Sequence, residues 1–184
     1  MALTSSTMPA LGSPLPKFQL HDPVTGTTRD SDEFGTPLVV MFLCNHCPFV
    51  VHVLDGLLAL TREYLDRGVA FVAINSNDVE SYPADAPDRM AELARDKAFG
   101  FPFLFDADQS VARAFGAACT PDFFVYDAAR TLAYRGQLDR SRPGNGVPVT
   151  GADLRAALDA LLAGQRPSEQ QRPSAGCNIK WRKS

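Results

Sequence analysis

Two cysteines in this chain are separated by two residues, in the motif Cys44-Asn45-His46-Cys47. This spacing keeps two sulfur atoms within reach of a disulfide bond. A continuous apolar run precedes the motif, and Pro48 follows it directly. Because proline is tolerated only in the first turn of a helix, we expect the pair to lie between a buried strand and a helix N-terminus. That position favours thiol–disulfide chemistry.

The helix start predicts how the two thiols would divide the reaction. Backbone N–H groups and the positive end of a helix dipole lower a thiol pKa from ~8.5 to about 3.5–7.5. We expect Cys44 to lie at an exposed tip and attack a substrate disulfide, and Cys47 to resolve the mixed disulfide. His46 lies between the sulfur atoms, so its protonated ring would lower the thiol pKa further and make the pair more oxidising.

Metal binding is the alternative reading of the same residues. Thiolates and imidazole bind Zn²⁺, and soft thiolates bind Cu(I), so Cys44, Cys47 and His46 could form a copper or zinc module. Cys119 or Cys177 could supply a further ligand. A four-ligand zinc site usually shows a second cysteine pair or a histidine pair at finger spacing, and the sequence has neither. We therefore expect no metal, and no cofactor apart from the redox-active disulfide.

Two further cysteines are candidate auxiliary redox thiols. Cys119 precedes Thr120-Pro121 and could be a third redox thiol or a small apolar filler in a packed loop. Cys177 lies near the end of the chain. It could resolve a disulfide or a sulfenic acid formed elsewhere, pair with Cys119, or have no consequence.

Four other polar residues have sequence positions that favour a role in substrate binding or catalysis less strongly. Arg140 and Arg142, in a Gly/Pro-rich loop, could polarise a peroxide or bind an anionic substrate, or be solvated. We expect His52 to lie on the solvated face of its helix without a role, and His21 to lie in a turn.

The composition excludes several classes of protein. A chain of 184 residues fits one domain, and its 45% hydrophobic content is ordinary for a soluble globular protein. The net charge of -3 gives no footprint for nucleic acid or an anionic membrane. Residues 1–16 lack the features of a secretory signal, and no apolar window reaches the ~20 residues of a membrane span. We expect a cytoplasmic protein whose thiols are kept reduced.

Periodicity along the chain predicts an α/β fold with a central mixed sheet flanked by helices on both faces. A flexible arm, residues 1–16, would precede a domain of residues 17–164, and residues 165–184 would form a tail that carries Cys177. The expected strands are 17–20, 38–43, 69–74, 103–105, 123–126 and 132–135, and the expected helices are 48–67, 88–98, 110–115 and 152–163.

Seven segments together resemble the thioredoxin superfamily, and more narrowly the bacterial alkyl hydroperoxide reductase/thiol-specific antioxidant (AhpC/TSA)-like proteins. They are FLCNHCPFV (42–50), AINSND (73–78), YPADAPDRM (82–90), FPFLFD (101–106), CTPDFFVYD (119–127), YRGQLDRSRPGNGVPVTGADL (134–154) and GCNIKW (176–181). The resemblance implies a thioredoxin-like fold in which Pro121 is a cis-proline facing the cysteine pair. Thr120 and Pro121 would then form the substrate groove together with Asn45 and His46.

The sequence departs from two patterns within that superfamily. Thioredoxins carry a buried acid in the strand before the motif, whereas residues 38–43 contain none, so water or His46 would have to manage the proton of the second thiol. Peroxiredoxins carry Pro-x-x-x-Thr-x-x-Cys-Pro. If Cys44 is aligned with the signature cysteine, Pro37 matches but Met41 stands in place of threonine. If Cys47 is aligned instead, the following proline matches but the upstream proline and threonine are missing.

The prediction is therefore a thiol–disulfide oxidoreductase, with a peroxiredoxin-like thiol peroxidase as the alternative enzyme. Its substrate would be a disulfide-bearing protein, a small thiol or a peroxide. A thioredoxin or glutathione system would return the pair to its reduced form.

Overall fold

The computed structural model describes residues 3–183. The strands are β1 (Leu3–Ser5), β2 (Gln19–Asp22), β3 (Thr27–Asp30), β4 (Leu38–Phe42), β5 (Ala70–Asn75), β6 (Phe103–Phe105), β7 (Cys119–Thr120), β8 (Asp122–Tyr126), β9 (Leu132–Gly136) and β10 (Ala175–Asn178). The α-helices are α1 (Pro48–Leu65), α2 (Pro87–Asp96), α3 (Ser110–Phe115) and α4 (Ala152–Leu162), and the 3₁₀ helices are η1 (Ser31–Glu33) and η2 (Pro83–Asp85). No helix in this part of the chain is long and apolar enough to cross a membrane.

The central sheet is mixed. Among the described residues it has seven strands in the order β3-β2-β6-β5-β4-β8-β9. β4 pairs in parallel with β5 and antiparallel with β8, so β4 lies inside the sheet with a neighbour on either side. The cysteine motif leaves the sheet directly after this strand. The predicted fold class is confirmed.

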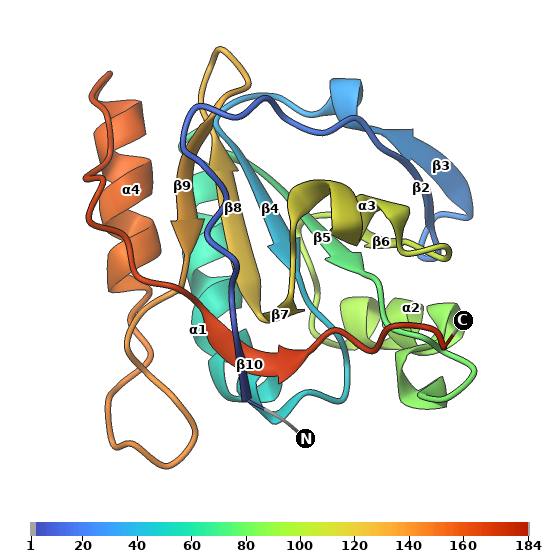
Figure 1. Ribbon diagram of the computed structural model, residues 1–184. Helices are drawn as coiled ribbons and strands as arrows, with labels where there is room; N and C mark the ends of the chain where they lie inside the picture. The colour runs from blue at the N-terminus through green and yellow to red at the C-terminus, as the bar shows by residue number, and fades with distance from the viewer. Residues whose placement is uncertain (1–2, 184) are drawn as a thin grey trace.

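Alternate residues of β4 enter two separate hydrophobic cores. Val39 and Met41 pack with the apolar faces of α1, α2 and α4, whereas Val40 and Phe42 pack with α3 and the N-terminal segment. Figure 1 shows α3 in front of the sheet and α1 behind it. Burial on both faces explains why this strand is a continuous apolar run rather than an alternating one.

The two ends of the chain differ from the expected flexible arm and separate tail. β10 pairs antiparallel with β1 on one side and with β7 on the other, and together they form a small second sheet. The amide of Ser6 donates to the carbonyl of Ser174 at 2.9 Å and continues this pairing. Such short strands are held by backbone hydrogen bonds and carry no apolar period, so the sequence pattern did not reveal them.

Gly176 allows β10 to approach β7 closely. A Cβ atom at this position would lie 2.0 Å from the carbonyl oxygen of Thr120, which is closer than any real contact. Any side chain here would therefore push the C-terminal strand away from β7. Figure 1 shows β10 passing the base of α1, with the N-terminal strand on its outer side.

The packing of α1 against the sheet generates a stability prediction. Leu57 is fully buried in the core, whereas Val51, on the same helix, is 61% exposed. We predict that Leu57→Ala lowers the free energy of unfolding by about 3 kcal/mol, because it removes buried methyl groups and leaves a cavity. Val51→Ala is the matched control and should change it by less than about 0.5 kcal/mol. Urea denaturation of both variants measures this, and equal losses would contradict the packing described.

Candidate active site

The cysteine motif lies where β4 ends and α1 begins, as predicted. Cys47 is the N-cap residue of α1, and its carbonyl accepts the amide of Val51 at 3.0 Å. Pro48 occupies the first turn, where its missing N–H costs nothing. The prediction that Cys44 lies at an exposed tip is wrong, because the residue is only 1% exposed. The loop folds inward, and other segments of the chain cover it.

Thr120 and Cys177 lie against the cysteine pair. The Cys44 sulfur lies 3.4 Å from the hydroxyl of Thr120, and the Cys47 sulfur lies 3.2 Å from the Thr120 carbonyl oxygen. The Thr120–Pro121 peptide bond is cis. The thiol of Cys177 hydrogen-bonds with that of Cys47. Three of the four cysteines therefore meet at one point, with Cys47 in the middle.

The two motif thiols share one proton. Cys44 donates to the Cys47 sulfur, and this bond is the largest of the effects that lower the pKa of Cys47 to about 4, with further help from Cys177, Thr120 and the Val50 amide. The same bond, followed by burial and the Asp85 carboxylate, raises the pKa of Cys44 well above its usual range. The Thr120 carbonyl favours a protonated Cys47, but the donors around the sulfur outweigh it. The first thiolate of the pair therefore resides on Cys47.

Asp85, a residue that the sequence analysis did not single out, holds the motif loop in place. Its carboxylate is fully buried and accepts the backbone amides of Asn45 and His46 at 2.8 and 3.2 Å. The other oxygen accepts Asn77 Nδ2 at 2.8 Å and lies 2.5 Å from Nδ1 of His46. In the sequence, Asp85 is an acid among small residues and prolines in the segment 82–90. That composition is also typical of an exposed loop, so it did not indicate a buried carboxylate.

His46 is held at one ring face and at its Nδ1 atom. The imidazole stacks on Tyr82 with ring centroids 5.4 Å apart and an interplanar angle of 10°. Its Nε2 atom and the Oδ1 atom of Asn45 are buried and have no hydrogen-bond partner among the described residues. Each of the two central side chains of the motif thus keeps one buried polar atom without a hydrogen bond in the described part of the chain.

The structure gathers a different set of potential metal ligands from the one predicted. One ligand atom each from Cys44, His46 and Asp85 lies within 4.8 Å of the others. The predicted set contained Cys47 instead of Asp85. In the structure the Asp85 carboxylate already engages Nδ1 of His46 and two loop amides, whereas Nε2 of His46 has no partner among the described residues. A copper or zinc module stays a prediction.

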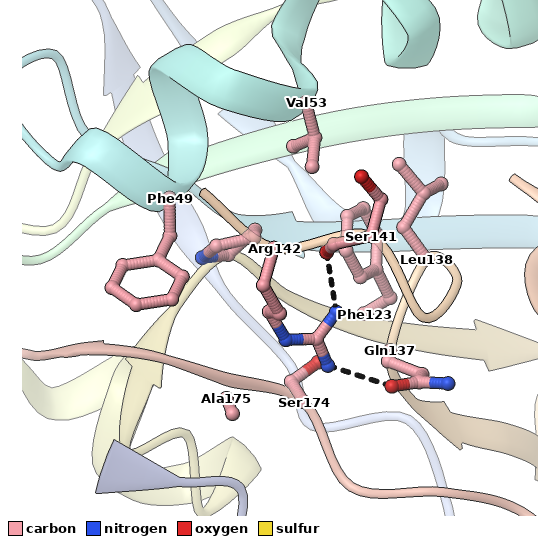
Figure 2. A pocket seen from close by; sticks show the side chains of 10 residues that line it. Phe49, Val53, Phe123, Gln137, Leu138, Ser141, Arg142, Ser174 and Ala175 are labelled. Atoms are coloured by element: carbon pink, nitrogen blue, oxygen red, sulfur yellow. Dashed lines mark hydrogen bonds between the residues drawn. The ribbon is translucent and has the colours of Figure 1, made fainter. Parts of the chain in front are cut away.

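Arg142 is the candidate arginine that reaches the site. It lines a small hollow beside Pro121, and its guanidinium donates to the Gln137 side chain at 2.6 Å and to the Ser141 carbonyl at 2.7 Å (Figure 2). Arg140 is exposed, and its backbone carbonyl accepts a bond from Asn145. The hollow is lined by Phe49, Val53, Pro121, Phe123, Gln137, Leu138, Ser141, Arg142, Ser174 and Ala175.

Three other residues lie near this region. His52 is not simply solvated, since its Nε2 atom lies 2.7 Å from the hydroxyl of Ser141. Cys119 is buried in β7, where burial and the Asp122 carboxyl raise its pKa. The Cys119 sulfur lies 3.9 Å from the Pro121 carbonyl, which fits the role of an apolar filler. Asp122 is itself buried, and the loss of water raises the pKa of its carboxyl.

The family is decided by comparison with known proteins. The family model described as "AhpC/TSA family" matches residues 11–135, which is more than half of the chain. The chain belongs to the AhpC/TSA family. Its fold is thioredoxin-like, and the family is one of thiol oxidoreductases and peroxidases.

Solved structures agree with this assignment. An uncharacterized conserved protein from Geobacillus kaustophilus is 49% identical with a TM-score of 0.98, over 100% of this chain and 98% of that one. Peroxidoxin BcpB from Mycobacterium tuberculosis is 21% identical (TM-score 0.61, covering 85% and 97%). A thiol:disulfide interchange protein from Chlorobium tepidum is 20% identical (TM-score 0.63, covering 84% and 99%). The last two show the fold alone.

A curated relative is more distant. Protein FixW of Rhizobium leguminosarum is 24% identical over 135 residues, which is 70% of this chain. The chain spans 61% of the length of that protein.

The shared proton predicts how this AhpC/TSA protein titrates. We expect ultraviolet absorbance of the reduced protein to show one thiolate with an apparent pKa near 4 and no second one from the motif until well above pH 9. Cys47→Ser should remove the low-pH step, and Cys44→Ala should raise its pKa because the hydrogen-bond donor to the Cys47 sulfur is lost. A low-pH step that survives in Cys47→Ser would contradict this account.

The same shift predicts a pH dependence of stability. The folded-state pKa of Cys47 lies below the ordinary value of ~8.5, so the folded state binds fewer protons than the unfolded state between about pH 4 and 8.5. The free energy of unfolding of the reduced protein should therefore gain a contribution as the pH rises through this window. Cys47→Ser should lose that contribution, and parallel pH profiles for both proteins would contradict it.

Removing the charge of Asp85 tests the anchor of the loop. We predict that Asp85→Asn lowers the free energy of unfolding by about 3 kcal/mol, because one oxygen of a buried, multiply bonded carboxylate becomes a donor that faces other donors. The pKa of Cys44 should also fall, since the carboxylate contributes to raising it. Asp88→Asn, an exposed acid at the start of α2, is the control, and urea denaturation is the measurement. Equal stability of the two variants would contradict the anchor.

Proposed function

We propose that this protein is a thiol–disulfide oxidoreductase that cycles Cys44 and Cys47 between two thiols and a disulfide. The observation that carries the proposal is the direct contact of the two thiols at the N-cap of α1, where one is held as a thiolate by the other. A thiolate with a neighbouring thiol is the pair of groups that disulfide exchange requires.

The proposed cycle assigns the first attack to Cys47, which differs from the sequence prediction of attack by Cys44. The Cys47 thiolate attacks one sulfur of a substrate disulfide, the substrate S–S bond breaks, and one substrate thiolate leaves. Cys44 then loses its proton and attacks the Cys47 sulfur, which releases the second substrate thiolate and leaves the Cys44–Cys47 disulfide. A thioredoxin or glutathione system returns two electrons.

Asp85 would manage the proton of the second thiol. Its carboxylate lies within 4.8 Å of the Cys44 sulfur and is reached from η2 rather than from the strand before the motif. The carboxylate opposes ionisation of Cys44 at rest and can accept its proton, through His46, when Cys44 attacks. In this proposal Asp85 takes the role of the buried acid that thioredoxins carry in the strand before the motif and that β4 lacks.

A peroxidase is the second candidate, and the position of Cys47 favours it. A helix N-cap cysteine followed by proline carries the latter half of the peroxiredoxin signature. Cys47 thiolate would be oxidised by a hydroperoxide to a sulfenic acid with release of water or an alcohol. Cys44 would then displace water from that sulfenic acid to close the same disulfide. Arg142 lines the hollow beside Pro121 and is the arginine that would bind a peroxide there.

Single-turnover kinetics tests both candidates. Reduced protein is mixed with oxidised glutathione or with hydrogen peroxide, and the loss of the free thiol at each cysteine is followed by alkylation and mass spectrometry after acid quenching, together with closure of the Cys44–Cys47 disulfide in the wild type. We predict that Cys47→Ser slows the first step by about 10³-fold or more with the preferred oxidant, because the attacking thiolate is lost. Cys44→Ser should keep the first step, and Cys119→Ser is the matched control with no change. If Cys47→Ser keeps the wild-type rate with both oxidants, the proposed function is wrong.

A further inference from the structure

The exposed edge beside a cis-proline is where an extended substrate chain would add as a strand in this fold. In this protein that edge is already occupied. β10 pairs antiparallel with β7, so that Cys177 lies opposite Thr120 and Asn178 lies opposite Cys119. A protein substrate that pairs here must first displace the C-terminal strand of the same chain.

Several contacts seat β10 in this position. The amide of Ile179 donates to the carbonyl of Ala118 at 3.0 Å, and the amide of Lys180 donates to Oδ1 of Asn77 at 2.8 Å. Asn77 also binds Asp85, so the strand is joined to the anchor of the motif loop. On its outer side β10 pairs with β1. The C-terminal strand is thus an integral wall of the site.

The C-terminal strand carries a thiol, Cys177, at a position that contacts the Cys47 sulfur. Cys177 is 3% exposed, and its thiol hydrogen-bonds with Cys47. Burial and the neighbouring Cys47 sulfur raise the pKa of Cys177 to about 12, while the Phe49 amide and Lys180 favour its thiolate. Cys47 therefore has one thiol neighbour in its own motif and a second on β10.

We propose that Cys177 is a third redox thiol that exchanges with the Cys44–Cys47 disulfide to form a Cys47–Cys177 disulfide. The proposal rests on the proposed function for the first oxidation of the pair. In this proposal the C-terminal strand occupies the position where a substrate strand would pair, and Cys177 takes the role of the substrate cysteine.

The exchange balances without any outside reagent. Cys177 loses its proton and its thiolate attacks the Cys47 sulfur. The Cys47–Cys177 bond forms, the Cys44–Cys47 bond breaks, and Cys44 leaves as a thiolate that takes up a proton. Two electrons pass from Cys177 to Cys44. Once Cys47 is in a disulfide it no longer carries a thiolate charge, and this removes one of the causes that raise the pKa values of Cys44 and Cys177.

Disulfide mapping of Cys44→Ser tests the contact independently of the proposed cycle. The folded variant is oxidised with one equivalent of diamide, and its disulfides are identified by non-reducing proteolysis and mass spectrometry. We expect a Cys47–Cys177 disulfide as the main product, and the same product when Cys119→Ser is added. A folded variant whose Cys47 and Cys177 stay reduced, or pair elsewhere, would overturn the proposal.

Gly176→Ala, added to Cys44→Ser, tests whether the strand delivers the thiol. A Cβ atom there would meet the Thr120 carbonyl, so we expect the yield of Cys47–Cys177 disulfide to fall at least ten-fold while circular dichroism shows a folded protein. Gly35→Ala, where no atom lies within 4 Å of the added Cβ, is the control and should keep the yield. An unchanged yield in the Gly176→Ala variant would count against delivery by β10.

The transfer itself is measured in the wild-type chain. After stoichiometric oxidation we expect both Cys44–Cys47 and Cys47–Cys177 disulfides at equilibrium, and only the first in Cys177→Ser. A wild-type product that is entirely Cys44–Cys47 would overturn the exchange. If Cys177→Ser forms no Cys44–Cys47 disulfide, the proposed function fails, whereas the result for Cys44→Ser still decides the role of Cys177.

Discussion

The chemistry of this site depends on one proton held between two buried sulfur atoms. Cys44 and Cys47 are both excluded from water, and burial alone would keep both thiols neutral. The helix N-cap and the hydrogen bond from Cys44 lower the pKa of Cys47 despite its burial. The same hydrogen bond raises the pKa of Cys44 further. In the proposed cycle this single constraint supplies both the nucleophile, Cys47, and a neighbouring thiol that keeps its proton until the nucleophile has reacted.

The geometry that allows this sharing is imposed from outside the motif. β4 delivers Cys44 from the centre of the sheet, and α1 fixes Cys47 at its first turn. The intervening loop would be free to open without the buried Asp85 carboxylate, which binds two of its backbone amides. Asp85 is therefore both a structural anchor and a negative charge that raises the pKa of Cys44. Removing it affects stability and thiol chemistry together.

The sequence predicts the central part of this structure well because that part obeys periodic rules. The apolar run of β4, the proline after Cys47 and the alternation of helices and strands were enough to predict the sheet and the position of the motif. The strands that sequence analysis missed are β1, β3, β7 and β10, which are short and are held by backbone hydrogen bonds that do not depend on a pattern of side chains. Asp85 was missed because its role depends on a loop folding over the motif, which no local pattern encodes. Cys177 was recognised as a candidate, but its contact with Cys47 follows from register and from the missing side chain of Gly176.

Membership of the AhpC/TSA family sets the class of chemistry but not the order in which the thiols react. That order is the central claim, and nuclear magnetic resonance of protein labelled with ¹³C at cysteine Cβ tests it residue by residue. The account predicts that the Cys47 Cβ signal of the reduced protein titrates with an apparent pKa near 4, while the Cys44 signal stays that of a thiol well beyond pH 9. Titration of Cys44 first, with Cys47 unchanged over the same range, would contradict it.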